Sequence, residues 1–253
     1  MARKQRIRSS SNIYHVMLRG INHQQIFYDE HDYSFFLDRL SYFKGISNYE
    51  IYAYCLMGNH IHLLIKTCGE PLEIIFRRIG SSFVYWYNAK YKRSGHLFQD
   101  RFKSEVVENE QYFVTVLRYI IQNPINAGLC ASAVDYAYSS AREYMRGYSV
   151  ITDIDFAMKM VGREALRIYL ERKNDDKCLD IDNDAMFPLS DSDAILLIKQ
   201  ELGSFYPNSQ SDFKANQEKA IIQLIKKGVK VRQLNRLSGI SRGMIRRVLR
   251  TIG

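Results

Sequence analysis

Apolar and polar side chains alternate along several short segments of the chain. Residues 12–19 alternate with a period of two, which indicates a half-buried strand, and residues 20–25 form the turn that follows. Residues 49–67 are rich in aromatic and aliphatic side chains, and only Gly58 interrupts them, so we expect one or two adjacent strands there. Residues 98–107 predict a further strand.

Two helices are expected between these strands. Asp29 and Asp32 have the spacing of a capping box in front of an apolar stripe, and residues 45–48 interrupt the helix that they begin. Pro71 opens a second helical stretch, because proline is favoured in a first turn. This stretch is expected to run to about Tyr91, and Ser94 and Gly95 follow its end.

A third helix is expected to begin at Asn109, a residue type that caps helices, and to end at Gln122. It should end there because Asn123, which precedes Pro124, avoids the helical region. Residues 144–172 again have a helical period. Strands and helices mix without a regular βαβ rhythm, so the predicted fold class is α+β, with an antiparallel sheet flanked by helices.

The C-terminal part predicts a compact, basic helical unit. Residues 217–252 show a helix, a break at Gly228, a helix, a turn at Gly239 and a last helix that Ser241 caps. This order is typical of a helix-turn-helix. Its small apolar core is expected to contain Leu234, Leu237, Ile240, Ile245 and Val248.

The charge of the chain favours a polyanionic partner. Its 253 residues carry a formal net charge of +9 and a pI of about 9.3, although this balance does not separate DNA from RNA or a membrane surface. The 18 tyrosines and 13 phenylalanines include rings that could stack on unpaired bases, and many others will form core. No apolar run approaches the roughly 20 residues that span a bilayer, and the 4 cysteines lack C-x-x-C spacing. We therefore expect a soluble, intracellular protein with reduced thiols.

Two histidines on one strand form a candidate metal site. His60 and His62 are two residues apart, so both imidazoles project from one face while Ile61 packs behind them. Imidazole suits Mn, Co, Ni or Zn better than Mg, so the ion stays open. The alternative is a pair of hydrogen-bonded histidines at the end of a strand.

The helix that begins at Asn109 supplies a nucleophile and a third ligand. Tyr112, Val116, Tyr119 and Asn123 share one stripe of this helix. A carboxamide oxygen can complete a metal site with two histidines, and a phenol one turn away would lie beside the same ion. The alternative for Tyr119 is an ordinary core tyrosine, because the chain has 18 of them.

Four segments together resemble one family. The strings HVMLRGINHQQIF, GNHIHLLI, GHLFQDRFKSEVV and RYIIQNPINAGL occur in order. They resemble the single-tyrosine HUH transposases of insertion sequences, the IS200-like transposases, and above all the branch of REP-associated tyrosine transposases. The similarity covers roughly residues 10–145. It implies the ferredoxin-like fold of HUH endonucleases.

The resemblance also implies roles for the candidate residues. His60 and His62 would bind a divalent metal ion, Mg or Mn, and Tyr119 would attack single-stranded DNA to form a 5′-phosphotyrosine. Asn123 would be the third ligand, where many insertion-sequence members have Gln. The implied partner is single-stranded or hairpin DNA with a palindromic repeat. The protein would act in the cytoplasm, associated with the nucleoid, as a monomer or homodimer.

These observations divide the chain into three predicted parts. Residues 1–145 form the HUH tyrosine transposase domain, residues 146–192 a helical extension and linker, and residues 193–253 a helical DNA-binding domain with the helix-turn-helix. Residues 173–193 are acidic and polar, which makes them the best linker candidate.

Basic residues in both terminal parts are candidate DNA contacts. The aromatic run at residues 83–87 could stack on bases, and its alternative is a structural role. The C-terminal basic face could bind phosphates, and its alternative is a protein-interaction unit. The candidates are Arg19, Lys92, Arg93, Arg101, Arg242, Arg246, Arg247 and Arg250.

Two other functions remain open from the sequence. One is a catalytically silent, sequence-specific DNA-binding regulator derived from such a transposase. The other is a metal-dependent hydrolase that uses His60 and His62 with a water molecule and needs no tyrosine.

Overall fold

The structure is a computed structural model that describes residues 7–172, 178–179, 191–203, 210–227, 229 and 231–250. Most of the predicted linker at residues 173–193 lies outside the described residues, as does the predicted break at Gly228.

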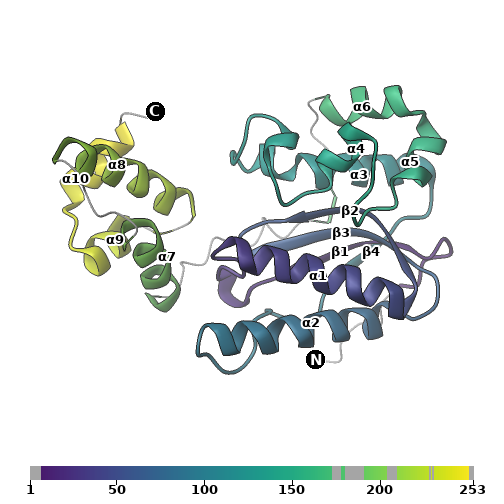
Figure 1. The fold of residues 1–253 in the computed structure, drawn as a ribbon, viewed down its shortest axis with the longest axis horizontal. Coiled ribbons are helices and arrows are strands. Elements are labelled where there is room, and N and C mark those ends of the chain that lie inside the picture. Colours follow the sequence, from purple (N-terminus) through teal and green to yellow (C-terminus); the bar gives the residue numbers. More distant parts are fainter. Residues whose placement is uncertain are drawn as a thin grey trace.

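A four-stranded antiparallel sheet forms the centre of the N-terminal part (Figure 1). Its strand order is β2-β3-β1-β4. With two helices, α1 and α2, the element order β1-α1-β2-β3-α2-β4 is ferredoxin-like. The predicted α+β class is confirmed. The bounds are β1 (Ile13–Arg19), α1 (Glu30–Ser47), β2 (Tyr49–Leu56), β3 (His60–Thr67), α2 (Leu72–Lys90) and β4 (Lys103–Val106).

The edge strand β4 is shorter than the strand predicted at residues 98–107. Only Lys103–Val106 pairs with β1, while Phe98 makes an isolated bridge to Gly20. The prediction is wrong in length because the segment leaves the ladder between its pairing at Lys103, opposite Met17, and its bridge at Phe98, opposite Gly20. The longer stretch on this side cannot follow the three-residue step of β1 from Met17 to Gly20, so it bulges away from the strand.

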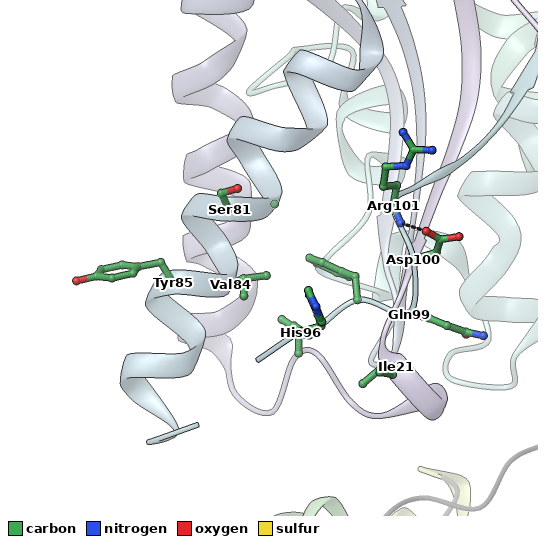
Figure 2. A pocket seen from close by; sticks show the side chains of 11 residues that line it. Ile21, Ser81, Val84, Tyr85, His96, Gln99, Asp100 and Arg101 are labelled. Carbon is green, nitrogen blue, oxygen red and sulfur yellow. Dashed lines mark hydrogen bonds between the residues drawn. The ribbon is translucent and has the colours of Figure 1, made fainter. Parts of the chain in front are cut away.

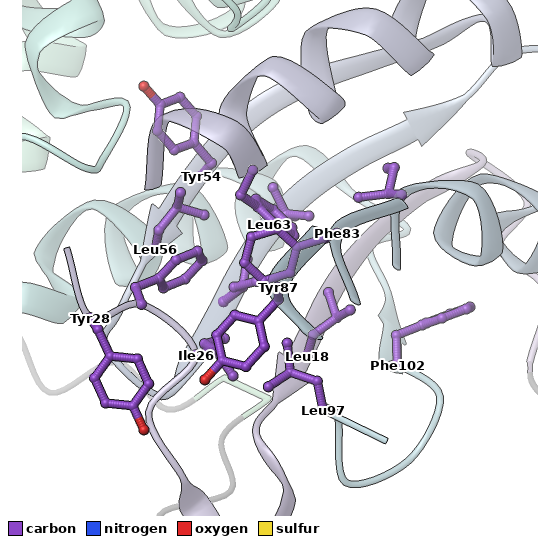
Figure 3. Packing of buried hydrophobic residues seen from close by; sticks show 14 of the residues in the cluster. Leu18, Ile26, Tyr28, Tyr54, Leu56, Leu63, Phe83, Tyr87, Leu97 and Phe102 are labelled. Carbon is purple, nitrogen blue, oxygen red and sulfur yellow. The ribbon is translucent and has the colours of Figure 1, made fainter. Parts of the chain in front are cut away.

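The two faces of the sheet bury different side chains. On one face, Ile61, Leu63 and Ile65 of β3 pack with residues of α1 and α2 in a large apolar cluster (Figure 3). The opposite face carries the β3 residues between them, which include His60 and His62. This face packs against α3 (Glu110–Asn126). One face is thus apolar, and the other carries the two histidines.

Buried charge joins α1 to α2. The Asp29 and Asp32 side chains form the predicted capping box. Asp32 is fully buried, and its carboxylate accepts hydrogen bonds from Lys90 Nζ at 2.7 Å and from the Tyr91 hydroxyl at 2.7 Å. The helix break predicted at residues 45–48 begins too early. Helix α1 continues to Ser47, and it ends where Asn48 adopts a left-handed φ of 48°.

Helix α3 continues past its predicted end. It runs to Asn126 with Pro124 inside it, and the Ala127 N–H still bonds to the Asn123 carbonyl at 3.0 Å. The proline removes one backbone donor, but α3 buries side chains up to Gln122 and again at Pro124, beyond the expected stop. This packing outweighs the local preference of the residue before proline.

The helical stretch predicted at residues 144–172 consists of separate short helices. They are α4 (Ala141–Arg146), α5 (Ile154–Val161) and α6 (Arg163–Glu171). Gly147 and Gly162 follow α4 and α5 with φ of 73° and 87°, values that favour glycine and end a helix.

The C-terminal helices form a bundle that Figure 1 shows beside the sheet. In α9–α10, Gly239 turns the chain with a φ of 76°, and the Ser241 hydroxyl accepts from the Met244 N–H at 3.2 Å. Leu234, Ile245 and Val248 are buried, as predicted. Within the described ranges, no helix combines the length and apolarity that a bilayer span requires. The bounds are α7 (Asp191–Gly203), α8 (Gln210–Lys226), α9 (Val231–Ser238) and α10 (Arg242–Arg250).

The buried charge of Asp32 should contribute strongly to stability. Replacing Asp32→Ala removes the buried acceptor of the Tyr91 hydroxyl and of the Tyr28 N–H, and it leaves Lys90 with Asp29 alone. The free energy of unfolding should therefore fall by about 3 kcal/mol. Chemical denaturation followed by circular dichroism measures this loss. Asp38→Ala, at an exposed position of the same helix, is the matched control and should change stability by less than about 0.5 kcal/mol. Equal losses in the two variants would contradict the assignment.

Candidate functional site

The paired histidines lie on the face of the sheet that α3 covers. His60 is opposite Arg19 on β1, and His62 is opposite Met17. The two imidazole centroids are 5.0 Å apart with their planes at 89°. His60 Nδ1 lies 2.7 Å from Asn59 Oδ1, so with Nδ1–H as the donor its Nε2 keeps a lone pair.

Tyr119 reaches this pair from α3. Its ring lies edge-on to the His62 imidazole, with centroids 5.6 Å apart and planes at 83°. Only 5% of the tyrosine is exposed. The structure therefore brings together the phenol of the helix and the imidazoles of the sheet, as the sequence predicts. Their catalytic roles stay predictions.

A third histidine joins the cluster, and the sequence analysis did not single it out. His15 Nε2 lies 3.0 Å from His62 Nδ1, and the His15 ring is 5.9 Å from that of Tyr119. On its other side, His15 Nδ1 lies 3.9 Å from the Glu105 carboxylate of β4. The sequence shows only that His15 alternates with Met17 and Arg19, which predicts that it lies on the same face of the strand. The strand register, which the structure supplies, places it beside His62.

Burial keeps the His62 imidazole neutral. His62 is fully buried, and burial lowers its pKa well below 6.5, with His60, His15 and Arg19 adding to the effect. Its Nε2 atom is buried and has no hydrogen-bond partner within the described part of the chain. A neutral imidazole with an unused buried nitrogen has the protonation state of a metal ligand.

Asn123 is the candidate for a third ligand. It lies one turn after Tyr119 on α3 and is half-buried. Among the described residues, no group of three His, Cys, Asp or Glu side chains is arranged to hold a metal ion. An amide oxygen with two imidazoles is a donor set that suits a divalent ion, and the unused Nε2 of His62 fits this set.

The four basic candidates of the N-terminal part have different surroundings. Arg19 is buried on the face of the sheet that carries His60 and His62, which we call the histidine face. Its guanidinium forms a hydrogen bond with His23. Arg93 is half-buried, donates to Gln24 Oε1 at 3.1 Å and lies over a tyrosine ring. Lys92 and Arg101 are exposed. Only these last two present freely accessible charge to a DNA backbone.

The four basic candidates of the bundle are all on α10. Arg242, Arg246, Arg247 and Arg250 are exposed, whereas Ile245 and Val248 face the bundle core. Helix α10 thus has one apolar side and a broad basic side.

Known proteins relate the first part of the chain to one family. Residues 8–123 match the family described as "Transposase IS200 like". None of the curated proteins matches the chain. A similar solved structure is that of a REP-associated tyrosine transposase bound to a REP hairpin, with 15% sequence identity and a TM-score of 0.54. The alignment covers 71% of this chain and 96% of that one, and at this identity it shows a shared fold.

The buried, neutral His62 should make stability depend on pH. In the unfolded chain, the His62 side chain binds a proton near pH 6.5, whereas in the folded protein it stays neutral to a much lower pH. Its contribution to the free energy of unfolding is therefore fully present above pH 6.5 and decreases as the pH falls below this value. Between about pH 7.5 and 5.5, the free energy of unfolding should fall by about 1.4 kcal/mol more in the unmodified protein than in His62→Asn. Chemical denaturation with a chelator present measures the difference. Parallel pH profiles of the two proteins would refute this assignment.

Proposed function

We propose, from the premise that residues 8–123 form an IS200-like transposase domain, that this protein cuts and rejoins single-stranded DNA through a covalent link to Tyr119. The observation that carries the proposal is the contact between the Tyr119 ring and the His62 imidazole, with His60 beside it. The two histidines come from β3 and the tyrosine from α3, two elements far apart in the sequence. Their convergence is what a tyrosine nucleophile next to a metal site requires.

The reaction is a transesterification. The Tyr119 phenol oxygen attacks a backbone phosphorus, a bond forms between them, and the bond from phosphorus to the 3′-oxygen breaks. The phenol loses its proton and the leaving 3′-oxygen takes one up, so the products are a 5′-phosphotyrosine and a free 3′-hydroxyl. A second 3′-hydroxyl then reverses the step and frees Tyr119. Because the phosphodiester energy stays in the protein–DNA link, the reaction needs no nucleotide cofactor.

His60, His62 and Asn123 would hold the divalent ion, for which Mg or Mn remains our expectation. When bound, the ion would polarise the scissile phosphate and stabilise the charge that develops on it. The chain's own contribution is orientation. His15 holds one nitrogen of His62 by a hydrogen bond, which leaves the other nitrogen directed away from it and fixes the ring.

The histidine face is largely closed. His15 and His62 are fully buried, and Tyr119 and His60 are 5% and 8% exposed. A DNA strand therefore reaches the phenol oxygen only if neighbouring side chains move aside. Binding can therefore occur without cleavage, and the two steps can be measured separately.

A DNA hairpin is the proposed substrate. The similar solved structure is bound to a REP hairpin, and the net charge of +9 of this chain suits such a polyanion. We propose that α9 and α10 act as a helix-turn-helix and supply a second DNA contact through the exposed arginines of α10. The proposed domain boundaries stay at residues 1–145, 146–192 and 193–253.

A covalent adduct is the direct test. Protein, Mn²⁺ and a single strand that contains a hairpin are incubated, and the products are separated on a denaturing gel. A 3′-labelled strand should label the protein, and a 5′-labelled strand should give a shorter product with a 3′-hydroxyl. Tyr119→Phe should abolish the adduct while DNA binding persists, and His60→Ala should slow its formation by about 100-fold. Tyr112→Phe, on the same stripe of α3, is the matched control and should keep the adduct.

Other products would assign a different function. Free 5′-phosphate ends without an adduct would indicate a metal-dependent hydrolase. Tight binding without cleavage, in all metals tried, would indicate a DNA-binding regulator. An adduct that persists in Tyr119→Phe would place the nucleophile elsewhere.

The role of α10 predicts a change in salt dependence. Replacing Arg246→Gln removes one exposed charge, so the slope of log affinity against log salt concentration should decrease by about one. Fluorescence anisotropy with a labelled hairpin gives this slope. Lys159→Gln, an exposed residue of α5, removes the same charge away from α10 and should leave the slope unchanged. If Arg246→Gln also leaves it unchanged, α10 does not contact DNA phosphates.

A further inference from the structure

A carboxylate lies at the outer end of the histidine cluster. Glu105 of the edge strand β4 is directly opposite His15 of β1, so the two side chains project from the same face of the sheet. The Glu105 carboxylate is 3.9 Å from His15 Nδ1, and His15 Nε2 is 3.0 Å from His62 Nδ1. Side chains of three neighbouring strands therefore form a row from the edge of the sheet to the His62 imidazole.

The two ends of this row differ in their exposure to water. His15 is fully buried, whereas 38% of the Glu105 side chain is exposed. The Leu179 N–H donates a hydrogen bond to the Glu105 carboxylate at 3.1 Å and holds it in place. At 3.9 Å the carboxylate and the His15 ring interact through charge rather than through a direct hydrogen bond. Water screens this charge less at the buried ring than it would between two exposed groups.

The charge of Glu105 determines which nitrogen of His15 carries the proton. Complete burial favours the neutral form of the His15 ring, which has one N–H and one lone pair. The carboxylate attracts an N–H on Nδ1 and repels a lone pair there, so it favours the tautomer that is protonated on Nδ1. His15 Nε2 then has the lone pair and accepts a hydrogen bond from His62 Nδ1–H.

The tautomer of His62 follows from that of His15. A neutral His62 with its proton on Nδ1 has its lone pair on Nε2, which a metal ligand requires. With the proton of His15 on Nε2 instead, His15 would donate to His62 Nδ1, and the His62 proton would be on Nε2. A protonated Nε2 cannot bind a metal ion. The two arrangements have the same packing and differ only in the positions of the protons.

We propose that Glu105 is a positioning residue that acts through His15 to keep the proton of His62 on Nδ1, so that His62 Nε2 is available to the metal ion. The inference rests on the proposed function and deepens it, because it assigns the choice of the metal-binding tautomer to a residue of the edge strand. Packing orients the His62 ring, and the carboxylate sets its protonation pattern.

The proton positions can be measured in the metal-free protein. Two-bond ¹H–¹⁵N correlation spectra of histidine-labelled protein, at about pH 8 with a chelator, show which ring nitrogen carries the proton. Comparison with His62→Asn assigns the His62 signals. We expect Nδ1–H for His62 in the unmodified protein and a shift towards Nε2–H in Glu105→Gln, which removes the charge. Glu105→Asp retains the charge and should keep Nδ1–H predominant.

The affinity for Mn²⁺ alone gives a second readout. Electron paramagnetic resonance of free Mn²⁺ should show about tenfold weaker binding to Glu105→Gln, because loss of a partner behind a metal ligand usually weakens binding by about 10–100-fold. Glu110→Gln is the matched control, since Glu110 is an exposed carboxylate in the first turn of α3. It should bind Mn²⁺ like the unmodified protein.

The two replacements leave the open surface near the edge of the sheet unchanged. Figure 2 shows a hollow of about 670 Å³ that is lined by residues of α2 and of residues 96–101. Neither Glu105 nor Glu110 is among the residues that line it. A difference in Mn²⁺ affinity between the two variants therefore does not come from a change in this hollow.

A double replacement tests whether Glu105 acts through His15. His15→Phe keeps an aromatic ring at this position and removes both ring nitrogens. In this background Glu105→Gln should not weaken Mn²⁺ binding further, because the connection to His62 is already lost. Additive losses would show that Glu105 acts on the metal ion by its charge alone, and they would overturn the inference.

Two results in the spectra would also overturn the inference. One is an unchanged His62 tautomer in Glu105→Gln, and the other is a His15 ring that carries protons on both nitrogens in the unmodified protein. Thermal unfolding checks that each variant is folded. The spectra need neither metal nor DNA, so a missing Tyr119 adduct would refute the proposed function without deciding the role of Glu105.

Discussion

The antiparallel register between β1 and β3 is the constraint on which the candidate site depends. It sets His60 opposite Arg19 and His62 opposite Met17, and it brings His15 within hydrogen-bonding distance of His62. A slip of one residue would turn both imidazoles of β3 towards α1 and α2. Only the observed register buries Ile61 and its alternate neighbours in the apolar cluster, so the hydrophobic core holds the polar site in place.

The position of Tyr119 is likewise a consequence of packing. Helix α3 is anchored by apolar side chains on both sides of the tyrosine, and the same helix face carries the phenol to the imidazoles. Burying this polar cluster costs free energy, which the contacts from His15 to His62 and from His15 to Glu105 partly offset. Side chains held in this way lose little conformational freedom when a substrate binds.

The molecule separates chemistry from charge. The catalytic candidates His60, His62 and Tyr119 lie buried between the sheet and α3, while the exposed arginines that we expect to contact DNA are Arg101 and those of α10. In our proposed function the bundle gives affinity through phosphates, and the buried face performs the transesterification. A substrate that combines duplex and unpaired DNA would engage both regions.

Local sequence determined much of this protein, and long-range packing decided the rest. The alternation around His60 and His62, the capping box of Asp29 and Asp32, and the turn at Gly239 were predictable, because each depends on neighbours within a few residues. The length of β4, the continuation of α3 through its proline, the contact of His15 with His62 and the burial of Arg19 were not. These features depend on strand register and on which surfaces meet, and such contacts join residues that are distant in the chain.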